Sequence, residues 1–263
     1  MSDAAVTYTS YLRVDDLLDL QVPRSDGPEH DELLFIIVHQ VYELWFKQIL
    51  WELDHVVELL GTDDEHRAGH TLRRVLAILK VMVAQMDVLE TMTPLEFMSF
   101  RSRLDSASGF QSVQFRELES VLGLKDAAAL DRAGATGPAR QRLERRLNAP
   151  SLWDAFCALL ARRGFEVSAA VLDRDVTQPV GADASVQEAL IAAYRTDPAM
   201  AELCERLVDL DEGVQEWRYR HVKMVERTIG VKPGTGGSAG AGYLRTTLGR
   251  PLFPDLWEIR SRL

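Results

Sequence analysis

The sequence predicts an all-α protein that forms a single domain. Apolar residues recur at helical spacing through two long segments, residues 30–60 and 198–229, and this periodicity is the strongest structural signal in the chain. No segment alternates apolar and polar residues as a half-buried strand would, and no internal repeat is present. A chain of 263 residues could form one large domain or two ordinary ones, and we favour one domain over residues 1–263.

The composition excludes several classes of function. A net charge of -10 and a pI near 5.1 argue against a nucleic-acid partner, because phosphate binding needs a basic surface. The densest basic stretch, Arg140–Arg146, is interrupted by uncharged and acidic residues, which favours a solvated helix face. The longest apolar run, residues 33–38, is too short to cross a bilayer, and residues 1–8 lack the pattern of a signal peptide. We expect a cytoplasmic protein with no membrane partner.

The two cysteines, Cys157 and Cys204, lie far apart in the sequence, and each belongs to a helical pattern. Neither a disulfide framework nor a zinc ribbon is indicated. Reduced thiols are the simplest interpretation.

Residues 1–28 form an N-terminal arm. Residues 6–12 are aromatic and β-branched, residues 14–20 could make a short helix, and Pro23, Gly27 and Pro28 then break the pattern. An arm with two tyrosines and a leucine but no core of its own must place them on another surface. That surface could belong to its own domain or to a neighbouring subunit.

The first long helix is predicted over residues 30–60. Phe35, His39, Tyr42 and Phe46 fall on one face, and the helix is apolar around most of its circumference, so it belongs inside the protein. A histidine in that face either has a hydrogen-bond partner in the core or is there to bind a ligand.

The remaining helices follow from caps and periodicity. Gly61 ends the first helix, and Thr62–Asp64 offers an N-cap for a helix to about Thr91, which makes an antiparallel hairpin. Thr93, Pro94 and Glu96 form a capping box for a helix through about Leu104. Further helices are expected over residues 110–122, 151–163, 185–195, 198–229 and 243–248, with a short helix and loops over 123–150 and irregular structure over 176–184.

Two histidines, His39 and His221, lie on apolar stripes of the two longest helices and could face a common cavity. Such a pair suggests a haem, because one neutral imidazole can hold the iron while the other stands over the opposite face. For either histidine alone, a satisfied core histidine is the alternative. The His66/His70 pair lies among arginines and lacks the glutamate of a zinc-protease motif, so it gives little support for a metal site.

Two further features could bind a small ligand. Arg101 follows Phe97 by one helical turn, and a guanidinium beside aromatic rings can clamp a carboxylate; a surface arginine is the alternative. The glycine-rich loop, residues 234–240, lacks a phosphate-loop motif. It could be a mobile lid in which Thr235 offers a hydroxyl, or a plain flexible loop.

Five motifs in this order and spacing resemble those of the tryptophan 2,3-dioxygenase family. They are Phe35-Ile-Ile-Val-His39-Gln with Tyr42-Glu-Leu-Trp-Phe-Lys47, Phe97 with Arg101, Ser108-Gly-Phe-Gln-Ser112, Trp217-Arg-Tyr-Arg-His221, and Gly234-Thr-Gly-Gly-Ser238. The resemblance runs from Tyr8 to the C-terminal region. It implies a helical bundle that encloses haem b with ferrous iron and cleaves the indole C2–C3 bond of L-tryptophan with O2. The product would be N-formyl-L-kynurenine, the first step of tryptophan degradation by the kynurenine pathway.

The resemblance also implies roles for individual residues. His221 matches the iron ligand, and His39 matches the distal histidine that hydrogen-bonds the indole N–H. Arg101 matches the residue that binds the substrate carboxylate, and Thr235 the one that holds its ammonium. Other substrate contacts are expected from Phe35, Ile36, Ile37, Val38, Phe97, Leu104, Ser108 and Gly234.

The N-terminal arm has a counterpart in the family as well. Tyr8, Tyr11 and Leu12 match residues that enter a neighbouring subunit's active site, which implies an exchanged arm and a homotetramer, a dimer of dimers. Two alternatives remain: an oxygenase of the same fold acting on a substituted tryptophan in secondary metabolism, and a non-catalytic haem or tryptophan sensor.

Overall fold

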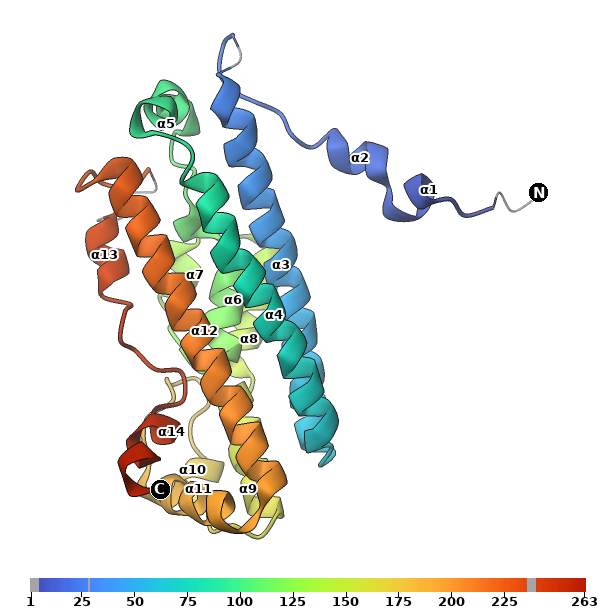
Figure 1. The fold of residues 1–263 in the computed structure, drawn as a ribbon, viewed down its shortest axis with the longest axis vertical. Coiled ribbons are helices and arrows are strands. Elements are labelled where there is room, and N and C mark those ends of the chain that lie inside the picture. The colour runs from blue at the N-terminus through green and yellow to red at the C-terminus, as the bar shows by residue number, and fades with distance from the viewer. Residues whose placement is uncertain (1–4, 28, 236–239) are drawn as a thin grey trace.

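Three long helices, α3 (His30–Gly61), α4 (Glu65–Leu89) and α12 (Pro198–Ile229), run along the long axis of the molecule (Figure 1). The computed structural model describes residues 5–27, 29–235 and 240–263. Helix α4 packs against both α3 and α12. No strand occurs in the described residues, so the predicted all-α class is confirmed.

The hairpin between α3 and α4 forms as the caps predict. Helix α3 continues through Gly61, one residue beyond the predicted end, and Asp64 accepts a hydrogen bond from the backbone N–H of Arg67. The three intervening residues leave room only for a tight reversal, so the two helices run antiparallel. The apolar faces of α3, α4 and α12 pack together and supply most of one continuous hydrophobic core.

Helix α5 (Pro94–Arg101) begins at the predicted capping box, in which Thr93 and Glu96 exchange hydrogen bonds. The α-helix ends earlier than predicted, because the chain tightens into the 3-10 turn η1 (Ser102–Leu104). The predicted helix over 110–122 is also divided. A second 3-10 turn, η2 (Gly109–Gln111), precedes α6 (Val113–Val121).

The region 123–150 is more ordered than predicted. It contains α7 (Ala129–Arg132) and α8 (Gly137–Asn148), and α8 buries Leu143 and Leu147 against α6. The basic stretch is only partly a solvated face, because Arg146 pairs with Asp54 and Glu117 on other helices. Those partners are remote in sequence, which is why the local pattern indicated a looser structure.

The remaining helices close the far end of the molecule. Helix α9 (Leu152–Arg162) starts at the predicted cap, Ser151, and α11 (Ala184–Thr196) packs on α12. The elements α10 (Ala169–Leu172), α14 (Pro254–Glu258) and η3 (Ile259–Arg262) were not predicted, because segments this short carry little periodicity. The last predicted helix, over residues 243–248, lies at 241–245 as α13 (Ala241–Arg245).

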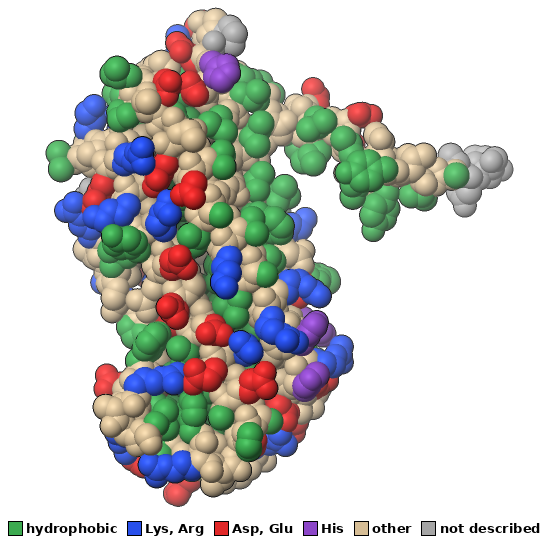
Figure 2. All heavy atoms as spheres, viewed as in Figure 1, with side chains coloured by type: hydrophobic (Ala, Val, Ile, Leu, Met, Phe, Trp, Pro, Cys, Tyr) green, Lys and Arg blue, Asp and Glu red, His purple; other side chains and the backbone are tan. Residues whose placement is uncertain are grey.

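The N-terminal arm extends away from the bundle (Figure 1) and carries α1 (Tyr8–Leu12) and α2 (Val14–Leu18). No residue of either helix is buried, and the hydrophobic side chains stand open to solvent (Figure 2). The base of the arm is fixed to α3. The Glu32 carboxylate accepts hydrogen bonds from the backbone N–H groups of Arg24 and Ser25.

Among the described helices, α3 alone is long and apolar enough to cross a membrane. Length and composition are weak evidence for a span, because the core helix of a soluble protein passes the same test. Leu53, Val56 and Leu60 on this helix are fully buried against the rest of the protein, and Glu52 pairs with Arg74 of α4. Helix α3 is therefore packed as a core helix.

Candidate active site

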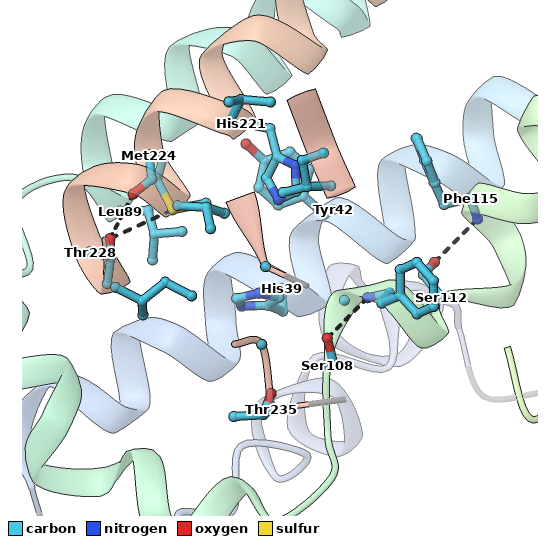
Figure 3. Close-up of a pocket in the computed structure, with 18 of the residues that line it drawn as sticks. His39, Tyr42, Leu89, Ser108, Ser112, Phe115, His221, Met224, Thr228 and Thr235 are labelled. Carbon is cyan, nitrogen blue, oxygen red and sulfur yellow. Dashed lines mark hydrogen bonds between the residues drawn. The ribbon is translucent and has the colours of Figure 1, made fainter. Parts of the chain in front are cut away.

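A cavity of about 240 Å³ opens between α3, α5, α6 and α12, near the α5 end of the bundle (Figure 3). Its walls combine aromatic and aliphatic side chains with a small set of histidines, arginines and hydroxyl groups. Of the predicted site residues, the structure brings eight to this cavity: Phe35, His39, Phe97, Arg101, Leu104, Ser108, Gly234 and Thr235. His221 from α12 also lines it.

His39 is held in one tautomer by its own helix. Its Nδ1 lies 2.7 Å from the carbonyl oxygen of Phe35, and a carbonyl can only accept, so Nδ1 carries the hydrogen. Burial lowers the pKa of His39, which keeps the ring neutral near pH 7. Nε2 is then a free acceptor on a ring that lines the cavity (Figure 3).

His221 lines the cavity from the opposite helix, α12, and makes no hydrogen bond within the part of the chain that the structure describes. Burial, with a smaller contribution from His39, lowers the pKa of His221 to about 4. The imidazole is therefore neutral at pH 7 and keeps a lone pair for a ligand. The Trp217 ring stacks on it with centroids 5.2 Å apart and an interplanar angle of 8°.

Two aromatic groups make the apolar walls. Phe35, Phe97 and Phe100 pack on one another with ring centroids 5.5 to 5.7 Å apart. Phe46 and Phe115 surround Trp217, with centroids 5.1 to 6.1 Å apart. The helical stripe that suggested a buried α3 thus serves as a wall of the cavity.

Arg101 and Thr235 join the end of α5 to the loop after α12. Arg101 Nη2 donates to the carbonyl oxygen of Pro233 at 2.6 Å, and the Thr235 hydroxyl donates to the carbonyl of Ala107. Arg101 Nε is buried and has no hydrogen-bond partner in residues 5–27, 29–235 and 240–263. The rest of the predicted lid, residues 236–239, lies outside the described residues.

The sequence reasoning missed two buried arginines in the cavity wall. Arg116 is 7% exposed and Arg218 5% exposed, and both pair with Glu119. Arg116 Nε and Arg218 Nη1 nevertheless lack a partner among the described residues. Arginines on amphipathic helices ordinarily point to solvent, so the local sequence held no signal that these two are internal.

The structure does not bring every predicted residue to the cavity. Ile36, Ile37 and Val38 do not line it: Ile37 is 41% exposed, and Val38 is buried in the core, where its carbonyl accepts a hydrogen bond from Gln85. These substrate contacts were predicted from a contiguous motif, but successive helical residues point in different directions. The arm residues Tyr8, Tyr11 and Leu12 are exposed and lie away from this chain's own cavity.

Comparison with known proteins gives one consistent result. The model of the tryptophan 2,3-dioxygenase family matches residues 1–135 and 182–263. Tryptophan 2,3-dioxygenase of Herpetosiphon aurantiacus is 60% identical, over 98% of this chain and 99% of the relative. The enzymes of that name from Anaeromyxobacter dehalogenans and Pseudomonas fluorescens are 57% and 44% identical, covering 99% and 98% of this chain and 97% and 92% of the relatives.

Proposed function

The chain belongs to the tryptophan 2,3-dioxygenase family, and we propose that it cleaves the indole C2–C3 bond of L-tryptophan with O2 to give N-formyl-L-kynurenine. The observation that carries the proposal is a single cavity that joins two neutral histidines, an arginine clamp and a threonine-bearing loop. The reaction would be the first step of tryptophan degradation by the kynurenine pathway. The chain would act as one domain in the cytoplasm.

The residues present fit a haem b. Arg116 Nε and Arg218 Nη1 are buried N–H groups that lack partners in the described chain, and a guanidinium is well suited to the carboxylates of a haem. The aromatic walls suit a flat apolar macrocycle, and the free lone pair of neutral His221 suits its iron. When bound, a ferrous haem would supply the iron that activates O2.

The protein's own contribution is mainly to position the substrate. His39 Nε2 would accept a hydrogen bond from the indole N–H, since its Nδ1 hydrogen is already committed to the Phe35 carbonyl. The Phe35 ring would pack on the indole, while Arg101 and Thr235 would hold the amino-acid end. Leu104, Phe97 and Ser108 complete the wall around it. Most of this wall is apolar, which favours the exclusion of water once the substrate is bound.

His221→Ala tests the cofactor assignment. We expect the variant to lose haem, because it removes the proposed iron ligand. His39→Ala should keep haem and show reduced but measurable turnover, because a hydrogen bond to the indole is not an obligatory proton abstraction. A His221→Ala protein with the absorption spectrum of the wild-type haem protein would show that another residue binds the iron.

The N-terminal arm supports an assembly of several copies. Tyr8 and Tyr11 are 77% and 76% exposed, and Leu12 is 46% exposed, so the arm leaves uncovered apolar surface that a neighbouring subunit's cavity could accept. We place these three residues in the active site of the neighbouring subunit. The exchange would give a dimer in which each site is completed by the partner's arm.

An exposed apolar seam on α3 supports the second contact of a homotetramer. Leu33, Ile37, Leu44 and Trp51 are 41 to 73% exposed, and the last three recur every seven residues. Val81 and Val88 on neighbouring α4 are also exposed and seven residues apart. Seven-residue apolar spacing is typical of helices that pack on partner helices.

Gel filtration tests the seam, and the KM for tryptophan tests the arm. Trp51→Glu should convert a tetramer to dimers, whereas Leu172→Glu, at an exposed leucine outside the seam, should not. Deletion of residues 1–12 should raise the KM for tryptophan. If the protein without residues 1–12 bound tryptophan as tightly as the full-length protein, the arm would not be part of the active site.

One experiment decides between the reactions. Haem-reconstituted protein, reduced and mixed with L-tryptophan and O2, should consume O2 and form a product heavier by two oxygen atoms. A product heavier by one atom would favour a monooxygenase on a substituted tryptophan. Absence of O2 consumption in a protein that binds haem and tryptophan would favour a sensor.

A further inference from the structure

A second cavity, of about 300 Å³ and more open to solvent, lies beside the main one. It is lined by Met98, Arg101, Ser102, Asp105 and Thr235. Arg101 and Thr235 also line the main cavity, so the two spaces share a wall. The residue at this junction that neither the motifs nor the family resemblance singled out is Asp105.

Asp105 holds a backbone conformation that ordinarily belongs to glycine. Its φ is 47° and its ψ is -115°, and the N–H of Ala107 donates to the carbonyl of Leu104 at 2.7 Å. These values describe the first central position of a type II′ turn, where a side chain is strained and glycine is preferred. After glycine, aspartate and asparagine best tolerate a positive φ, so the turn alone is compatible with an aspartate. What points to a function is that this strained position lines a cavity, because strained residues concentrate at functional sites.

The Asp105 side chain is also unused within the protein. It is exposed and makes no hydrogen bond or ion pair with any residue that the structure describes. The nearby Arg103 pairs instead with Asp26, at 3.2 Å. Arg101 lines the same cavity and keeps its buried Nε without a partner in the described chain. An unpaired carboxylate and a partly unpaired guanidinium thus line one cavity.

We propose that Asp105 is a specificity-determining residue that binds the α-ammonium group of the substrate while Arg101 binds its carboxylate. The inference rests on the proposed function and adds to it a negatively charged partner for the ammonium, beside Thr235. The two charges of an amino acid sit on one carbon, and Arg101 and Asp105 line the same cavity, so a single head group bound there can contact both. The Thr235 hydroxyl donates its hydrogen to Ala107, so its lone pairs remain to accept from the same ammonium.

Asp105 adds a full negative charge that a hydroxyl group cannot supply. An ammonium–carboxylate contact at an exposed site is partly screened by water and salt, so its effect is moderate. It discriminates L-tryptophan from an indole acid of the same length that lacks the ammonium. For that acid, indole-3-propionate, the Asp105 charge repels the carboxylate that Arg101 attracts.

The test compares Asp105→Asn and Asp105→Gly with wild-type haem-reconstituted enzyme. We expect both variants to raise the KM for L-tryptophan between about 3-fold and 10-fold. The inhibition constant of indole-3-propionate should stay unchanged or fall. Asp105→Gly should also raise Tm by about 2–4 °C, because glycine relieves the strained turn. Asp26→Asn, which removes an equal charge outside both cavities, should change none of these values.

Two results overturn the inference. An unchanged KM in both variants would show that Asp105 is only a turn residue. Equal weakening of L-tryptophan and indole-3-propionate would show that the turn positions Arg101 and does not recognise the ammonium. If the wild-type protein does not turn over tryptophan, the proposed function fails instead, and the same comparison is made on the dissociation constants of the two ligands.

Discussion

The two halves of α12 use buried polar groups in opposite ways. In the first half, Asp211 is fully buried, and its carboxylate accepts from the side chain of Gln215, the backbone of Leu252 and Phe253, and the indole N–H of Trp257. About 10 Å farther along the helix, Arg218 has a buried N–H without a partner in the described residues. A buried group whose hydrogen bonds are all made within the protein stabilises the fold. A buried group that lacks a partner is available to bind a ligand.

The same contrast separates the two ends of the molecule. At the far end, Asp154 caps α9 through Ser151 and pairs with Arg174. At the cavity end, Arg101 and Arg116 keep buried nitrogens that no described residue satisfies. Ser168 Oγ and Asp255 Oδ2 at the far end are also buried without a described partner, whereas Arg101 and Arg116 line an open cavity in which a ligand can complete them.

Asp211→Ala should produce the largest loss of stability. It would leave the buried N–H groups of Leu252, Phe253 and Trp257 unsatisfied, so we expect the free energy of unfolding to fall by about 3–5 kcal/mol. Urea denaturation of the haem-free protein measures this. Glu212→Ala, at the exposed next position, should change stability by less than about 0.5 kcal/mol. Similar losses in both variants would refute the anchoring role of Asp211.

Arg101→Ala should affect ligand binding and leave the fold almost intact. Within the described residues the guanidinium makes one hydrogen bond, to the carbonyl oxygen of Pro233, and its proposed partner is the substrate carboxylate. Loss of a charge-assisted pair worth about 2–3 kcal/mol would weaken tryptophan binding about 30- to 150-fold. Spectral titration of the haem protein measures the dissociation constant, and Arg103→Ala is the control. If Arg103→Ala weakened binding as much, the clamp would have to be assigned to another residue.

The sequence predicted the long elements well because they carry many turns of periodicity. The bounds of α12 were predicted correctly, and the caps at Ser151 and Thr93 lie where expected. Periodicity could not locate Asp211, because its partners lie about 40 residues later and an aspartate on a helix ordinarily faces water. The 3-10 turn after Arg101 was missed for a similar reason, since a single tight turn has no period.

Within the site, the sequence pattern predicted the histidines that lie on apolar helix faces. It did not predict the buried arginines, because a charged residue on a helix ordinarily faces solvent. His39 and His221 were identified because histidines interrupt buried faces. Arg116 and Arg218 were not, because only the tertiary structure shows that Glu119 draws them inward. Residues 36–38 carry part of the family resemblance but do not line the cavity, unlike Phe35 and His39 in the same motif.

The Asp154 cap should make the stability of the protein depend on pH in acid. Burial alone would raise the pKa of Asp154, but hydrogen bonds from Arg174 and Ser151 outweigh it and hold the pKa below its usual value. The unfolded chain therefore binds more protons in acid. The stabilisation is complete above about pH 4–5 and is lost as the pH falls below this range.

Asp154→Asn should lower the free energy of unfolding at pH 7 by about 1–2 kcal/mol. The difference from the wild-type protein should shrink at pH 3, where the wild-type carboxylate is itself becoming protonated. Urea midpoints at the two pH values measure this. Asp173→Asn, at an exposed carboxylate beside Arg174, is the control. A constant difference at both pH values would mean that the charge of Asp154 contributes nothing.

Arg218→Met should have the smallest effect on stability. In contrast to Asp211→Ala, it should change haem binding and leave the free energy of unfolding nearly unaltered. Replacing a buried, partly unpaired charge by an apolar side chain of similar volume is often neutral or stabilising, and Glu119 keeps its pair with Arg116. We therefore expect the stability of the haem-free protein to change by less than about 1 kcal/mol. Haem affinity should fall at least about tenfold, because a charge-assisted bond to a carboxylate is lost.

Arg220→Met is the matched control for this last change. Arg220 lies two residues further along α12, pairs with Asp87 and Glu90, and does not line the cavity. Its loss should leave haem affinity unaltered. A large loss of stability in haem-free Arg218→Met, with haem affinity unchanged, would show that Arg218 serves the fold as Asp211 does. The two halves of α12 would then differ only in how completely their buried groups are satisfied.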